Sequence, residues 1–158
     1  MRRHSCARRW GFSLLEVVIV VAIIAILAAI GIPRMSRGAR GANDSALSGD
    51  LATLRNAIDL YAAEHAGTYP DATDPNTQIT QYTNAAGGVA TAKDATHIYG
   101  PYMRTIPPLP VGAKKGGTKI GAASTAGVGW VYDATKGEVH ANTTDSEKDE
   151  AGKAYNVY

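Results

Sequence analysis

One carboxylate, Glu16, lies inside a long apolar stretch near the start of the chain. The stretch covers residues 12–32 and is apolar apart from Ser13, Glu16 and Gly31. As a helix, it would measure about 30 Å, which is the thickness of the hydrocarbon core of a bilayer. A charge at that depth costs several kcal/mol unless an opposite charge pairs with it. The chemistry predicted for Glu16 is therefore ion pairing inside a membrane.

A second group of acidic side chains lies near the end of the chain, and its members are Asp145, Glu147, Asp149 and Glu150. Carboxylate oxygens in a flexible segment are the hard ligands that Ca²⁺ prefers. The spacing is not that of an EF-hand loop, and the turn glycine of that loop is missing. Two interpretations remain open: a calcium site formed by Asp145, Glu147 and Asp149, or a solvated acidic tail.

The remaining sequence lacks the patterns of an active site. It has no glycine loop for phosphates, no CxxC pair and no His/Glu zinc spacing. His65, His97 and His140 are isolated from one another in the sequence. We therefore predict that the protein is not an enzyme and requires no cofactor, with calcium as the one candidate ligand.

The residues around Glu16 carry a family resemblance. Residues 11–16 read Gly-Phe-Ser-Leu-Leu-Glu and precede a long run of Val, Ile, Ala and Leu. This pattern resembles the class III signal of type IV pilins and of type II secretion pseudopilins. The resemblance implies that prepilin peptidase cuts between Gly11 and Phe12 and methylates the new amine of Phe12. Glu16 matches the lone acid of the family's membrane segment, and Pro33 matches a proline common near the end of that segment. Because pairing would offset the cost of a charge in lipid, we expect Glu16 to act in filament assembly, with the alternative that it only reaches the cytoplasmic interface. Because proline lacks an amide donor, we expect a helix kink at Pro33.

Three other interpretations of the apolar stretch compete with this one. A secretory signal peptide would end at Ala29-Ile30-Gly31, but the stretch is long for such a signal and an acid inside it is unusual. A twin-arginine signal would use Arg8-Arg9, although the apolar run is stronger than such signals usually carry. A plain membrane anchor explains the apolarity and leaves Glu16 unexplained.

The distribution of charge and cysteine suggests an orientation. The chain carries a formal charge of +2, and residues 1–11 contain four arginines. Removing these residues leaves 12 basic and 14 acidic side chains, a charge of −2, so we expect no nucleic-acid partner. The positive-inside rule places the N-terminus in the bacterial cytoplasm, with one span of the inner membrane and the C-terminal part periplasmic or extracellular. The only cysteine, Cys6, would leave with the leader, so the mature chain could form no internal disulfide.

We expect four segments: a cleaved leader at residues 1–11, a transmembrane and assembly helix at 12–32, an amphipathic helix at 33–66, and a globular head at 67–158. The amphipathic helix is predicted from apolar residues that recur on one helical face. These residues are Leu47, Leu51, Leu54, Ile58 and Tyr61. We expect this helix to end near His65, with Gly67 at the C′ position and Pro70 preventing continuation.

The predicted fold is α+β and pilin-like, with the long helix packed on a small antiparallel C-terminal sheet. Asp74-Pro75 predicts the start of a short helix with Ile79 and Tyr82 on one face. Residues 84–96 are expected to form a loop, and the proline-rich residues 99–110 an extended strap that cannot be a regular element. Strands are predicted at residues 119–122, 128–132 and 138–141, with a hairpin loop between the last two and Trp130 in the core.

The resemblance implies a structural subunit of a type II secretion pseudopilus, closest to the major, G-type pseudopilin. Its expected partners are further copies of itself, prepilin peptidase, an inner-membrane assembly platform, a cytoplasmic ATPase, and minor pilins or pseudopilins. Two alternatives stay open: a type IV pilin serving adhesion, motility or DNA uptake, and a signal-anchored periplasmic binding domain or enzyme.

Processing is the first testable prediction. Because the Gly11–Phe12 junction separates a basic leader from the apolar run, the protein extracted from membranes should lack 11 residues and carry one N-terminal methyl group. Intact mass spectrometry measures both changes. A mature terminus at Ile32, after Ala29-Ile30-Gly31, would instead show an ordinary secretory signal peptide.

Overall fold

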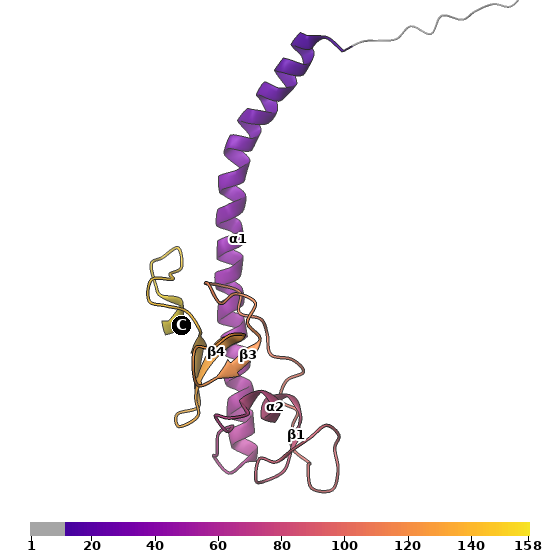
Figure 1. The fold of residues 1–158 in the computed structure, drawn as a ribbon, viewed down its shortest axis with the longest axis vertical. Helices are drawn as coiled ribbons and strands as arrows, with labels where there is room; N and C mark the ends of the chain where they lie inside the picture. Colours follow the sequence, from indigo (N-terminus) through magenta and orange to yellow (C-terminus); the bar gives the residue numbers. More distant parts are fainter. Residues whose placement is uncertain (1–11) are drawn as a thin grey trace, which may run out of the picture. The chain divides into compact units, whose positions relative to one another are not determined.

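The computed structural model describes residues 12–158, except for the side chains of residues 32–37. The chain divides into two compact units, Met1–Ala39 and Arg40–Tyr158. The elements, most of which are labelled in Figure 1, are α1 (Leu14–Glu64), α2 (Pro75–Thr80), β1 (Tyr82–Thr83), β2 (Val89–Ala90), β3 (Lys119–Gly121), β4 (Val128–Asp133), β5 (Glu138–Ala141) and the 3₁₀ helix η1 (Tyr155–Val157). The α+β fold class predicted from the sequence is confirmed.

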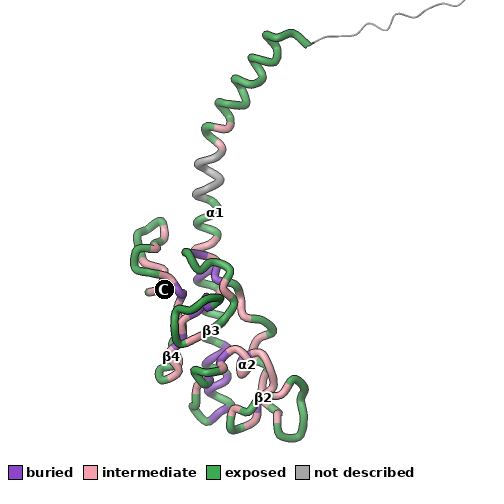
Figure 2. Tube along the Cα trace, viewed as in Figure 1, coloured by how far each residue is buried: buried purple, intermediate pink, exposed green. Residues whose placement is uncertain are grey.

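The core of the second unit forms on the apolar stripe of α1. All five predicted stripe residues are buried, with exposed fractions between 0 and 2%, namely Leu47, Leu51, Leu54, Ile58 and Tyr61. Buried side chains from the sheet and from the segments before it complete the cluster, among them Trp130, Val139, Leu109 and Ile79. Figure 2 shows this alternation of buried and exposed positions along the part of α1 in the second unit. The 3.6-residue periodicity therefore predicted which face of the helix is covered.

The end of α1 differs from the prediction by one position. The helix ends at Glu64, and the Gly67 N–H donates to the Ala62 carbonyl at 2.8 Å. This bond makes Gly67 the C″ residue and puts Ala66 at C′, where Ala66 has φ +54°. A left-handed conformation costs an L-residue about 1 kcal/mol. The sequence predicted Gly67 at C′, where glycine avoids this cost, and the structure corrects that assignment to Ala66.

The main sheet has the strand order β3-β4-β5. β4 and β5 pair antiparallel, from Trp130 opposite Ala141 to Asp133 opposite Glu138, as the predicted hairpin requires. β3, however, pairs parallel to β4, so the expectation of a purely antiparallel sheet was wrong. Parallel neighbours usually need a long crossover. Here β3 has only three residues. The short connection between the two strands is therefore long enough to bring the chain back to the end of the sheet at which β3 begins.

The first part of the head contains more structure than the sequence predicted. α2 begins as expected, with Pro75 in its first turn and the Asp74 carboxylate accepting from the Thr77 N–H at 3.3 Å. Tyr82 does not continue this helix but lies in β1, which pairs antiparallel with β2. β2 falls inside residues 84–96, which were expected to be a loop throughout. Two-residue strands are too short for an alternating pattern to reveal them.

The strap of residues 99–110 is extended and bonded to the elements around it. The N–H groups of Tyr102 and Met103 donate to the Ile79 carbonyl at 3.0 and 3.2 Å. The indole N–H of Trp130 donates to the Pro107 carbonyl at 2.8 Å. Trp130 is fully buried, as predicted, and this bond satisfies its only polar side-chain atom. The strap thus connects α2 to the central strand of the sheet.

The side chain of Asn76 closes part of the outer edge of β3. Its Oδ1 accepts from the Ile120 N–H at 2.7 Å, and its Nδ2 donates to the Ile120 carbonyl at 2.8 Å. The amide therefore bonds to Ile120 as a neighbouring strand would. Exposed strand edges invite pairing with other chains, and an edge residue bonded in this way is protected.

Candidate functional site

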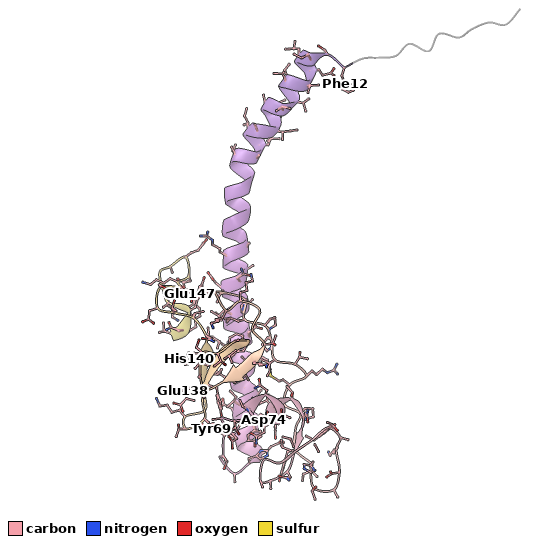
Figure 3. The ribbon with its side chains drawn as sticks, viewed as in Figure 1. Phe12, Tyr69, Asp74, Glu138, His140 and Glu147 are labelled. Atoms are coloured by element: carbon pink, nitrogen blue, oxygen red, sulfur yellow. The ribbon has the colours of Figure 1, made fainter. Side chains whose placement is uncertain are left out.

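The N-terminal segment begins with the residues that the motif singled out. α1 starts at Leu14, and the Val17 N–H donates to the Ser13 carbonyl at 3.3 Å. Phe12, labelled in Figure 3 at the start of this helix, is 82% exposed. Gly11, the other half of the predicted cleavage junction, lies outside the described residues. The cleavage and methylation sites stay predictions.

Apolar side chains cover α1 on all sides in its first turns. The window Leu14–Gly31 has 18 residues and a mean hydropathy of 3.0, and none of it is buried inside the chain. By length and composition, this helix is apolar enough to cross a membrane. Large side chains at successive positions are about half exposed, for example Val17, Val18, Ile19 and Val20. A helix with no covered face requires lipid, other protein chains, or both around it.

Glu16 lies in the first turn of this apolar helix and is exposed. The first turn is where a helix dipole favours a negative charge. Within the described residues Glu16 has no ion pair, because the salt bridges found there involve other side chains. Helix α1 continues through position 33, but the kink expected at Pro33 falls among residues whose side chains are not described, and it stays a prediction.

One comparison with known proteins bears on this segment. Residues 8–32 match the family model described as the prokaryotic N-terminal methylation motif. The match supports a type IV pilin-like protein. Such a motif implies processing by prepilin peptidase, assembly into filaments, and a structural subunit in place of an enzyme. Together with the apolar helix, it fits a membrane-anchored protein with a single span. No curated protein and no solved structure matched the chain.

The three calcium candidates lie in the segment after β5, where Figure 3 labels Glu147. Each carboxylate has its own hydrogen-bond donors. Glu147 accepts from the Ala113 N–H and, at 2.8 Å, from the Thr144 N–H. Because these N–H groups stabilise its ionised form, the pKa of Glu147 lies below its usual value.

The other two candidates are bonded elsewhere. Asp145 accepts from the Asn156 amide at 2.7 Å. Asp149 accepts from the Tyr158 hydroxyl and from the Lys153 N–H at 2.8 Å, and the hydroxyl bond lowers its pKa most. Among the described residues, no group of three or more His, Cys, Asp or Glu side chains is arranged to hold a metal ion. The structure therefore does not bring the three carboxylates together, and their donors were not evident from the sequence.

Calcium binding stays a prediction, and thermal unfolding of the mature full-length protein in detergent tests it. If Asp145, Glu147 and Asp149 rearrange around Ca²⁺, the melting temperature should rise. Ligand at about 100 times its Kd stabilises the native state by about 2.7 kcal/mol.

The double variant Asp145→Ala with Asp149→Ala should abolish the rise. Glu138→Ala with Glu150→Ala removes the same number of charges and should retain it. An unchanged melting temperature in about 10 mM calcium would remove the site, since extracellular sites bind in the range of about 0.1–1 mM.

Proposed function

We propose that this protein is a structural subunit of a pilus-like filament, and specifically a pseudopilin of a type II secretion system. The filament would polymerise in the cell envelope and drive protein export. The observation that carries the proposal is the lone carboxylate of Glu16 in an uncovered apolar helix that lies within the methylation motif.

The physical basis of assembly is the pairing of two charges that are costly in lipid. Cleavage before Phe12 would create a positive amine close in sequence to the carboxylate of Glu16. In a filament, staggered neighbours can bring the amine of one subunit to Glu16 of the next. Pairing offsets much of the cost that each charge has alone in the hydrocarbon. Assembly would thereby relieve the unpaired acid of the single subunit.

Two features favour a pseudopilin over a type IV pilin. Many type IV pilins close a C-terminal loop with a disulfide, and the only cysteine of this chain is Cys6, in the leader. The turn after α1 also carries the Tyr69-Pro70 pair that resembles pseudopilins. This turn is tied to the hairpin, because the Tyr132 hydroxyl donates to the Pro70 carbonyl at 3.0 Å.

The proposed setting follows from the arginines of residues 1–11. The N-terminus would face the cytoplasm, and the unit Arg40–Tyr158 would lie in the periplasm or outside the cell. Prepilin peptidase would process the chain, and an inner-membrane platform with a cytoplasmic ATPase would polymerise it. Minor pseudopilins are further expected partners.

Replacing Glu16 tests the proposal. The variant Glu16→Ala should be cleaved normally, since the Gly11–Phe12 junction is intact, and its head should melt as before. Filament formation should be lost or strongly reduced, because the amine of a neighbour would then lack its partner in lipid. Electron microscopy of overexpressing cells measures filaments, and the culture medium shows whether protein export is lost with them.

Glu138→Ala is the matched control, because it removes an exposed carboxylate of the head and should leave filaments intact. Normal filaments from Glu16→Ala cells would show that this carboxylate is not the assembly contact. Loss of surface pili with unchanged export would contradict the pseudopilin assignment and favour a type IV pilin.

A further inference from the structure

A groove of about 580 Å³ lies in the second unit, between α2, the strap and the start of β3. Its volume is within the range of ligand-binding pockets. Its wall combines one aliphatic side chain, Ile106, with three threonines and two cations. The proposed filament function uses none of these residues.

The groove runs along the outer edge of β3, the end strand of the sheet. The backbone N–H and C=O of Ile120 face away from β4, because both bond to the side chain of Asn76. The backbone N–H of Lys119 points the opposite way, toward β4, since it donates to the Gly127 carbonyl at 3.2 Å. Backbone groups alternate sides along an extended chain, so those of Thr118 lie on the same side as those of Ile120.

The edge is therefore open at Thr118. Asn76 and Thr118 line the same groove, which agrees with this placement. Within residues 12–158, no hydrogen bond of the structure involves the N–H or the C=O of Thr118. Thr118 as a whole residue is also exposed. One residue of β3 is protected by Asn76, and the position two residues before it is available for pairing.

The groove is positively charged, which favours an occupant with negative charge. Arg104 and Lys119 line it, and no carboxylate among the described residues does. In the part of the chain that the structure describes, neither cation forms an ion pair within 4.0 Å, because the two pairs found there involve His97 and Lys136. An occupant with a negatively charged side chain would complement this wall.

We propose that the groove binds an extended segment of another polypeptide that carries an acidic side chain. The segment adds beside β3 as a short strand. Its backbone accepts from the Thr118 N–H and donates to the Thr118 carbonyl, and its carboxylate lies between Arg104 and Lys119. Strand addition uses backbone hydrogen bonds for affinity and side-chain contacts for specificity. The inference goes beyond the filament function and does not depend on it.

The proposal is tested with the mature full-length protein in detergent micelles and a synthetic peptide, acetyl-Thr-Val-Asp-Val-Thr-amide. Nuclear magnetic resonance follows the backbone amides of Thr118 and Lys119 during the titration. We expect saturable shifts at both amides and slower hydrogen exchange at Thr118. The same peptide with lysine in place of aspartate should bind about tenfold more weakly, because its charge opposes the groove.

Two pairs of variants separate the backbone contact from the charge contact. Thr118→Pro removes the free N–H at an edge position where proline is tolerated, and should weaken binding about fivefold. Thr118→Val keeps the N–H and should bind as the unchanged protein does. Lys119→Glu should weaken binding about tenfold, whereas Lys136→Glu, which changes a hairpin lysine outside the groove, should not.

Several results would overturn the proposal. The absence of saturable shifts would exclude the site, and so would equal binding of the lysine peptide. Equal binding by Thr118→Pro would exclude strand addition, and equal shifts with inorganic phosphate alone would indicate a simple anion site. Shifts at Thr118 that grow with protein concentration without peptide would support the groove and identify the bound segment as part of a second copy.

Discussion

The strongest physical constraint on this protein is one carboxylate in an apolar helix, which has no ion-pair partner among the described residues. Glu16 lies in the first turn of α1, in a segment whose apolar side chains have no cover inside the chain. Lipid can cover Leu14 or Val17, but it cannot stabilise the charge of Glu16. A positive group must come from outside the segment or from its own processed terminus. The match of residues 8–32 to the methylation motif implies processing by prepilin peptidase, and a new terminus at Phe12 stays a prediction.

In the second unit, α1 instead buries an apolar face inside the protein. Between Leu47 and Tyr61, α1 has one apolar face, and the sheet and the strap bury it completely. Two hydrogen bonds fix the covering elements: the indole of Trp130 donates to the strap, and the hydroxyl of Tyr132 donates to the turn after α1. The second unit therefore has its own core, and the residues of this core include none from the apolar segment Leu14–Gly31.

The sequence predicted the features that depend on local periodicity or on single residues. The stripe from Leu47 to Tyr61, the Asp74-Pro75 helix start and the β4–β5 hairpin all follow from patterns within a few residues. The parallel pairing of β3 was missed because it depends on how short that strand is and on where its connection returns. Position 66 was missed because an alanine in a left-handed conformation contradicts its own preference.

Some features of the candidate sites could likewise be found from the local sequence, and others exist only in the folded chain. Glu16 could be recognised from sequence because an acid in an apolar run is an anomaly wherever it occurs. The donors of the tail carboxylates could not, since Ala113 reaches Glu147 only after the chain has folded. The open edge at Thr118 was hidden for a similar reason, because only the folded chain shows that the amide of Asn76 bonds to Ile120 and does not reach Thr118, two residues before it.

The structure of the assembled filament, determined by electron cryomicroscopy at a resolution that shows side chains, would test the pairing of Glu16 most directly. We predict that the amine of the mature Phe12 lies within about 4 Å of the Glu16 carboxylate of a neighbouring subunit, the usual limit for an ion pair. A filament in which Glu16 faces lipid or solvent, with the amine of every neighbour far from it, would contradict a central role for this carboxylate in assembly.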